Sequence, residues 1–157
     1  QLLKIAKLRS EGLSASAIVE KMKELRPKVR TQFAINTLEY LHMGGRCSGT
    51  SRLFGTLLKI KPIIRVIDGA MEIAKKPLGK YSKALDILLE YFANDKDNID
   101  PSCLAVTHSL ADEDAKYLID KIKNEYHFAN VIETKASGVI STHCGPRTIG
   151  ILYILKE

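Results

Sequence analysis

Residues 148–155 (TIGILYIL) constrain the fold most, because they are apolar at almost every position. Successive side chains of a strand point to opposite faces of a sheet, so a strand that is apolar on both faces needs cover on both. We therefore expect this segment to be a central strand. Such a strand requires partner strands on either side and further elements packed over the sheet.

Helical and strand patterns are mixed along the rest of the chain. Apolar spacing predicts helices at residues 1–12, 14–26, 37–43 and roughly 50–59, a long helix from residue 80, and another that Ser109 begins as a cap. Short alternating or β-branched runs predict strands at residues 31–36, 62–67, 71–75, 102–107, 131–134 and 148–155, with Asp68-Gly69 as a hairpin turn and residues 137–147 as a loop. The expected fold class is α/β (α+β): a two-layer mixed β-sheet of about six strands with helices packed mainly on one face.

The second helix, residues 14–26, is expected to bury the stripe that Ile18, Val19 and Met22 form among charged neighbours. Because the chain opens within a helix pattern and without Met, we also expect it to be a piece of a longer protein. Its apolar runs are too short for a membrane-spanning helix, which needs about 18 or more apolar residues.

Basic residues are concentrated in one half of the chain. The whole chain has 24 Lys and Arg against 18 Asp and Glu, a net charge of +6. Residues 1–80 hold 16 basic and 6 acidic side chains, a net +10, while residues 81–157 hold 8 and 12, a net −4. A basic half is compatible with nucleic acid, an acidic protein or a phosphate-bearing partner. Aromatic residues are only 6% of the chain and no nucleic-acid recognition motif is present, which argues against nucleic acid.

Cysteine spacing argues against a disulfide framework and against structural zinc. Cys47, Cys103 and Cys144 are odd in number, and no CxxC occurs. With no signal-peptide pattern at the start, we expect reduced cysteines and a cytoplasmic protein. A catalytic Cys–His pair is disfavoured because His143 and Cys144 are sequence neighbours, which point to opposite sides of an extended segment.

Two segments offer groups for ligand chemistry. Gly44-Gly45-Arg46 follows a helix, where the two glycines permit a close backbone approach and the Arg46 guanidinium suits a carboxylate or phosphate. Residues 141–146 (STHCGP) supply two hydroxyls and an imidazole on a turn. The alternatives are a plain helix end with a solvated Arg46 and a structural His143 in a tight turn.

In combination these segments resemble the DegV family. The resemblance rests on Thr37-Leu38-Glu39-Tyr40-Leu41, Gly44-Gly45-Arg46, Gly55-x-x-Leu58-x-Ile60-Lys61-Pro62-Ile63, Asp68-Gly69 and the closing Thr142-His143-x-Gly145-Pro146 with Gly150. Order and approximate spacing both match, from about Ala17 to Ile154. The sequence departs from the family pattern at Arg147, where a second glycine is usual, and Arg147 puts the geometry of that turn in question.

The resemblance implies a bacterial fatty-acid-binding protein that is the lipid-carrying subunit of a fatty acid kinase. Such a protein holds a long-chain fatty acid in an apolar tunnel and presents its carboxylate to the kinase catalytic subunit, which forms the acyl phosphate. It also implies no catalysis by this chain, no cofactor and no metal. Residues 1–157 would be a single domain, in which residues 1–30 are helices joining to a missing N-terminal DegV domain and residues 31–157 are the C-terminal lipid-binding domain.

The resemblance also implies roles for individual residues. The ligand carboxylate or tunnel rim would involve Arg46, Thr142, His143 and Gly145, with backbone amides around Gly145 as further donors. Candidate tunnel walls are Phe33, Ile35, Leu38, Leu41, Phe54, Leu57, Leu58, Ile60 and Ile64, whose alternative is ordinary core. Candidate residues for docking the kinase are Arg46, Lys75, Lys76 and Lys80.

Two other functions stay open at this point. A basic interaction module would bind nucleic acid or an acidic protein through residues 1–30, using Lys21, Lys23 and Arg26. A small-molecule enzyme would use His143 as a general base, although no nucleophile or substrate carbonyl is identifiable in the sequence.

Overall fold

A computed structural model describes residues 1–45, 60–67 and 69–156 of the chain. Six strands in these ranges form one sheet in the order β3-β2-β1-β6-β4-β5. They are β1 (Val29–Ala34), β2 (Ile63–Ile67), β3 (Ala70–Lys75), β4 (Ile99–Ser109), β5 (Ile132–Lys135) and β6 (Thr148–Leu155). The helices are α1 (Leu2–Ser10), α2 (Ala15–Leu25), α3 (Glu39–Met43), α4 (Ser82–Asp95), α5 (Asp112–Tyr126) and α6 (Gly138–Cys144), with 3-10 turns η1 (Arg26–Lys28) and η4 (Lys96–Asn98). Only β4 and β5 pair in parallel, so the predicted mixed sheet of six strands is confirmed.

The segment that is apolar on both faces forms β6, at the centre of the sheet. It pairs antiparallel with β1 on one side and with β4 on the other. Ile149 and Ile151 are fully buried. Gly150 faces the opposite side, and a Cβ there would lie 2.8 Å from the carbonyl oxygen of Gln32, so the strand approaches β1 too closely for a larger residue.

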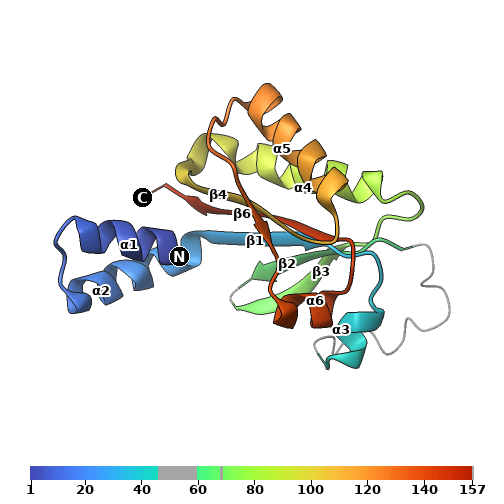
Figure 1. Ribbon diagram of the computed structural model, residues 1–157, viewed down its shortest axis with the longest axis horizontal. Helices are drawn as coiled ribbons and strands as arrows, with labels where there is room; N and C mark the ends of the chain where they lie inside the picture. Colours follow the sequence, from blue (N-terminus) through green and yellow to red (C-terminus); the bar gives the residue numbers. More distant parts are fainter. Residues whose placement is uncertain (46–59, 68, 157) are drawn as a thin grey trace.

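Helices α4 and α5 cover one face of the sheet and enclose the main core, as Figure 1 shows. The amphipathic pattern predicted from residue 80 onward is the buried face of α4. Phe92 lies at the centre of this core, with ring centroids 5.3 Å from Tyr126, 5.3 Å from Phe128 and 5.8 Å from Tyr153, all edge to face. Burial of each large apolar side chain contributes about 1.5–3 kcal/mol.

Among the described residues, the opposite face carries the two short helices α3 and α6, which lie side by side at one end (Figure 1). The expectation that helices pack mainly on one face is therefore confirmed. The β2–β3 hairpin forms as predicted, with Ile67 paired to Ala70 and Gly69 at a φ of +84°. Asp68 and the helix predicted at residues 50–59 lie outside the described residues.

The N-terminal helices bury less than their pattern predicts. In α2, Val19 is 52% exposed, and Leu25 is the residue whose side chain is fully enclosed. In α1, Leu2 is 81% exposed while Leu8 is buried. Ile18 and Met22 are half-buried, so the predicted stripe is buried only in part and is wrong for Val19, because α1 and α2 extend away from the sheet and pack on each other (Figure 1).

One local expectation is also wrong, for a reason of hydrogen bonding. Ser109 does not cap α5; the helix begins after Ala111, whose amide donates instead to Nδ1 of His108 at 3.2 Å. On β1, the polar Gln32 is buried, where its amide donates to the hydroxyl of Tyr153 at 3.2 Å.

Residues 137–147, expected to be a loop, contain helix α6. The Ser137 side chain accepts a hydrogen bond from the amide of Ile140 and caps the start of the helix, and Gly145, with a φ of +80°, ends it. The sequence of α6 is rich in glycine, serine, threonine and β-branched residues, which are poor helix formers, so its pattern does not predict a helix.

Replacing Phe92 by Ala should lower the free energy of unfolding by about 3–5 kcal/mol, because it leaves a cavity among three aromatic rings. Urea unfolding followed by circular dichroism measures the loss. Phe128→Ala is the matched control, since Phe128 packs at the half-buried edge of the same core. Equal losses for the two variants would contradict the central position assigned to Phe92.

Candidate functional site

A second, smaller apolar cluster lies on the face of the sheet opposite α4 and α5. It consists of Ile35, Leu38, Leu41, Ile64 and Cys144, with Phe33 and Ile73 partly buried against it. These residues come from β1, the segment after it, α3, β2, β3 and α6. We call this set the α3–α6 cluster. It brings together groups that are more than a hundred residues apart in the sequence.

The cluster contains five of the residues predicted to wall a tunnel: Phe33, Ile35, Leu38, Leu41 and Ile64. Ile60 is partly buried at an isolated bridge to Leu78 and is not part of the cluster. The remaining tunnel candidates, Phe54, Leu57 and Leu58, lie outside the described residues.

Sequence reasoning missed two members of the cluster, Ile73 and Cys144. Ile73 could have been found from the hairpin, because the β2–β3 register places it opposite Ile64. Cys144 could not have been found from the sequence, because it is buried only when residues 138–144 form helix α6, which the pattern did not predict. Burial raises the pKa of the Cys144 thiol, which disfavours the reactive thiolate.

His143 lies at the end of α6, one residue before the cluster member Cys144. A Cβ added to Gly44, the residue that follows α3, would lie 2.1 Å from Nδ1 of His143. A Cβ added to Gly145 would lie 2.3 Å from the ring of Tyr40. Each helix thus packs an aromatic or imidazole ring against a glycine of the other, and this close contact requires both glycines.

The other predicted carboxylate contacts are already engaged within the protein. The Thr142 hydroxyl donates to the carbonyl of Gly138 at 2.8 Å, one turn back in α6. The Gly145 amide donates to the carbonyl of Ser141 at 2.8 Å, and the Arg147 amide donates to that of Ser109 at 2.7 Å. The amides of Gly145 and Arg147 are therefore not free donors in this structure. Arg46 lies outside the described residues.

Arg147 adopts the conformation that a glycine would favour and is stabilised there by its side chain. Its φ is +57°, in the left-handed region. Its guanidinium donates to Asp114 through Nε at 2.9 Å and Nη2 at 3.3 Å, and lies 4.8 Å from the centre of the Tyr81 ring. The hydrogen bond to Asp114 raises the pKa of Arg147. Its side chain thus points to α5, and the turn forms despite the departure from the family pattern.

Tyr81, the residue before α4, supports the same turn. Its hydroxyl donates to the carbonyl of Arg147 at 2.6 Å and lies 3.2 Å from the carbonyl oxygen of Ala34. Burial raises the pKa of Tyr81 far above its ordinary value, so the hydroxyl stays protonated as a donor. Lys61, which the sequence motif contains without a role, donates to the side-chain oxygen of Asn36 at 2.7 Å and holds the segment after β1.

The lysines predicted for partner docking lie around the end of β3. Lys75 pairs with Glu90 at 3.0 Å and lies over the ring of Tyr91, which directs it to α4 rather than to the α3–α6 cluster. Lys76 and Lys80 are exposed, and their side chains make no hydrogen bond or ion pair with the described residues.

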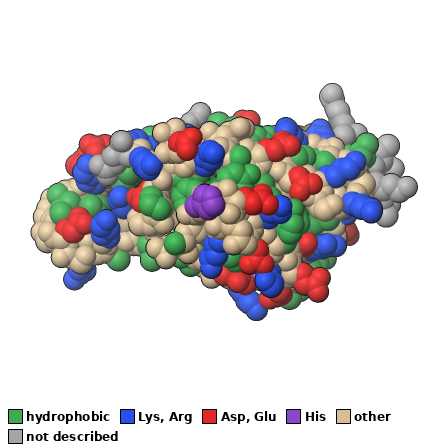
Figure 2. All heavy atoms as spheres, turned by 90° about the horizontal axis from the view of Figure 1, so that it is seen from above, with side chains coloured by type: hydrophobic (Ala, Val, Ile, Leu, Met, Phe, Trp, Pro, Cys, Tyr) green, Lys and Arg blue, Asp and Glu red, His purple; other side chains and the backbone are tan. Residues whose placement is uncertain are grey.

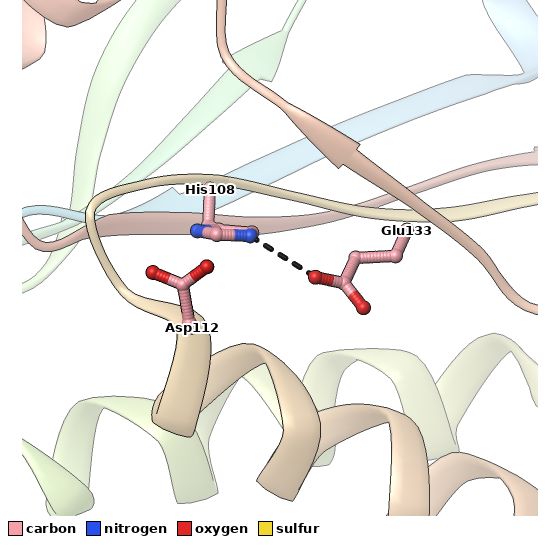
Figure 3. A group of neighbouring side chains, drawn as sticks. All are labelled: His108, Asp112 and Glu133. Carbon is pink, nitrogen blue, oxygen red and sulfur yellow. Dashed lines mark hydrogen bonds and ion pairs between the residues drawn. The ribbon is translucent and has the colours of Figure 1, made fainter.

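A separate group of His108, Asp112 and Glu133 offers ligand atoms within 4.8 Å of one another and is drawn in Figure 3. Nδ1 of His108 accepts the amide of Ala111, so the ring proton is on Nε2, which lies 3.3 Å from Glu133. A metal on Nε2 would have to displace that proton. Lys135, 3.4 Å from Asp112, holds the pKa of that carboxyl below its usual range. These hydrogen bonds and ion pairs explain why the three residues lie close together: they connect β4, α5 and β5.

In the part of the chain that the structure describes, the face opposite α4 and α5 combines an apolar cluster with the imidazole of His143, the composition of sites that bind mostly apolar molecules. A family model described as "Uncharacterised protein, DegV family" matches residues 1–156. The chain therefore belongs to the DegV family, as its motifs indicated.

Individual relatives agree with this assignment. A DegV domain-containing protein of Clostridium perfringens (CPE0304) is 32% identical over 152 residues, covering 97% of this chain and 53% of the relative. A structure described as fatty acid binding of a DegV family protein from Thermus thermophilus has a TM-score of 0.83 at 25% identity, over 98% of this chain and 55% of the other. The Streptococcus pneumoniae fatty acid kinase B3 protein, loaded with linoleic acid, shares the fold at a TM-score of 0.83 and 20% identity, over 99% and 55% of the two chains.

The chain spans about half the length of the curated relatives it matches. In the described part of the chain, every helix is too short or too polar to cross a bilayer.

The conformation of Arg147 gives a stability prediction. Arg147→Ala and Arg147→Gly lose the same contacts with Asp114 and Tyr81, but alanine keeps the left-handed strain. Urea unfolding should therefore find Arg147→Ala less stable than Arg147→Gly by about 1 kcal/mol. The reverse order would show that the turn changes conformation when the arginine is removed.

Proposed function

We propose that this chain is the acyl-chain-binding part of a DegV-family fatty-acid-binding protein. The observation that carries the proposal is the α3–α6 cluster, an apolar set on the face of the sheet opposite α4 and α5, with the imidazole of His143 beside its member Cys144. Each methylene of a fatty acid that leaves water there contributes about 0.8 kcal/mol. The fatty-acid binding stated for the Thermus thermophilus relative supports the same ligand class.

In this proposal the ligand is a long-chain fatty acid, with its chain along the α3–α6 cluster and its carboxylate near His143. A carboxylate only accepts hydrogen bonds and needs donors when water is excluded. The chain itself would catalyse nothing and would need no cofactor. Residues 31–157 would form the lipid-binding domain and residues 1–30 the connection to an N-terminal DegV domain.

The bound carboxylate would be presented to the catalytic subunit of a fatty acid kinase. A carboxylate oxygen would form a bond to the γ-phosphorus of ATP held by that subunit, the bond from this phosphorus to the β–γ bridging oxygen would break, and ADP would leave. We also propose a cytoplasmic location, because three widely spaced cysteines without a CxxC pattern favour reduced thiols.

The lipid-binding proposal is tested by a matched pair of isoleucine variants in the native protein that carries this chain. Ile73 and Ile87 are both partly buried, Ile73 against the α3–α6 cluster and Ile87 against the core under α4. Ile73→Ala should weaken binding of palmitate or oleate by up to about tenfold, because it removes contacts with the chain. Ile87→Ala should leave it unchanged.

Native mass spectrometry and fluorescent fatty-acid displacement measure the binding, and circular dichroism checks that both variants fold. No bound lipid in the purified native protein, with no mass shift on adding palmitate or oleate, would refute the proposal. Equal weakening by the two variants would place the acyl chain elsewhere.

The docking proposal concerns Arg46, Lys75, Lys76 and Lys80. Exposed lysines with no internal partner suit an acidic surface on the kinase. Lys76→Ala with Lys80→Ala should slow kinase-coupled acyl-phosphate formation and make it less sensitive to salt, while lipid binding is retained. Lys116→Ala with Lys123→Ala, two exposed lysines of α5, is the control of equal charge. Unchanged kinetics in the first double variant would remove these lysines from the interface.

The alternative, a basic module acting through residues 1–30, receives less support from the charges. Lys23 pairs with Glu20 at 2.8 Å and Lys21 with Glu24 at 3.6 Å, so the outer face of α2 is partly neutralised. On the face of the molecule shown in Figure 2, basic and acidic side chains are interspersed. Sequence-independent nucleic-acid binding requires a continuous basic surface.

A further inference from the structure

The contact between His143 and Gly44 has a consequence for the proton of the imidazole. Nδ1 of His143 is buried and has no hydrogen-bond partner among the described residues. A buried ring nitrogen without a partner costs about 1–3 kcal/mol whether it is an N–H donor or an acceptor, so the missing hydrogen bond does not by itself select a tautomer. The tautomer is therefore determined by what lies against Nδ1.

The atom that lies against Nδ1 is a hydrogen of Gly44. A Cβ on Gly44 would be 2.1 Å from Nδ1, but 2.9 Å from Cε1 and 3.2 Å from Cγ of the same ring. A point above the ring face at that distance from Nδ1 would lie much nearer to both carbons, so the position is in the ring plane, outward from the nitrogen. In glycine a Cα hydrogen occupies this direction. It points at the nitrogen lone pair, where the proton of an Nδ1–H form would have to be.

We infer that Gly44 holds His143 as the Nε2–H tautomer, so that His143 is a hydrogen-bond donor to the anionic end of the ligand. Gly44 is thus a positioning residue that acts through His143. This inference rests on the proposed function for its ligand, the carboxylate of a fatty acid. The tautomer itself follows from the packing of α3 against α6.

Among the described hydrogen-bond donors near the end of α6, Nε2 of His143 is the one that remains for the ligand carboxylate. His143 is half-buried, and its Nε2 makes no hydrogen bond with the described residues, so its proton remains available for a ligand. The hydroxyl of Thr142 and the amides of Gly145 and Arg147 are bonded within the protein. A proton on Nε2 also opposes the alternative in which His143 is a general base, because the unprotonated nitrogen faces Gly44 rather than a substrate.

Nuclear magnetic resonance of the native protein labelled with ¹⁵N-histidine tests the tautomer directly. Two-bond proton–nitrogen correlations distinguish a protonated from an unprotonated ring nitrogen, and His143→Gln identifies the signals. His108 is an internal reference, since its Nδ1 accepts the amide of Ala111 and its Nε2 must carry the proton. At neutral pH we expect the same pattern for His143. A protonated Nδ1, in either the neutral or the charged ring, would overturn the inference.

The role of Gly44 is tested by Gly44→Ala, with Gly138→Ala as its control. A Cβ on Gly138, in the partner helix α6, has no atom within 4 Å. Gly44→Ala should displace the ring, change the His143 signals and weaken palmitate binding about tenfold or more, the effect of losing a hydrogen bond to a charged group. Gly138→Ala should change neither measurement.

Two further variants separate positioning from general destabilisation. In His143→Ala, which removes the ring, adding Gly44→Ala should weaken palmitate binding no further. His143→Gln, whose amide can donate at the position of Nε2, should bind palmitate more tightly than His143→Asn. An equal effect of Gly44→Ala with and without the imidazole would overturn the positioning role.

The same data separate failure of the inference from failure of the proposed function. Native protein that binds no palmitate refutes the lipid-binding role, yet the histidine spectra still decide the tautomer. Native protein that binds palmitate but has a protonated Nδ1 refutes the inference and leaves the lipid-binding role intact.

Discussion

The pairing of β6 with β1 and β4 is the interaction on which the rest of the structure depends. Six consecutive residues of β1 pair with β6, so one register determines which side chains go to each face. Gln32 and Ile151 face α4 and α5, while Phe33 and Gly150 face the other side. A slip of one residue would move Phe33 from the α3–α6 cluster into the main core. The stability of the core and the composition of the candidate site are therefore set by the same strand pair.

The sequence predicted the parts of the fold that have strong periodicity. The apolar run that became β6, the amphipathic α4 and the β2–β3 hairpin each have a local signal that tertiary contacts reinforce. Helix α6 was missed because its stability comes from a Ser137 cap and from packing on α3 rather than from propensity. The burial of Gln32 has no signal in the sequence, because its partner, Tyr153, is 121 residues away. Contacts of that separation leave no local pattern.

The candidate site was predicted in its apolar part more fully than in its polar part. Phe33 and Ile64 were predicted because apolar residues of a strand must pack in an apolar cluster. The motif resemblance then assigned them to the wall of a lipid tunnel. The hydrogen-bonding state of Thr142 and Gly145 was not predictable, because it depends on a helix that the pattern did not show. The effect of Arg147 was not predictable either: its compensation comes from Asp114 on α5, which no local motif connects to the turn.

The two ring–glycine contacts between α3 and α6 explain why these motif residues belong together physically. Tyr40 needs the absence of a side chain at Gly145, and His143 needs it at Gly44, so each helix limits the sequence of the other. A tight contact between two short helices would be a weak source of stability by itself, because few apolar groups are buried there. What the contact determines is the orientation of the His143 imidazole. A Cα hydrogen of Gly44 excludes the ring proton from Nδ1 and leaves it on Nε2. A backbone position with no chemistry of its own thereby determines which nitrogen of His143 can donate.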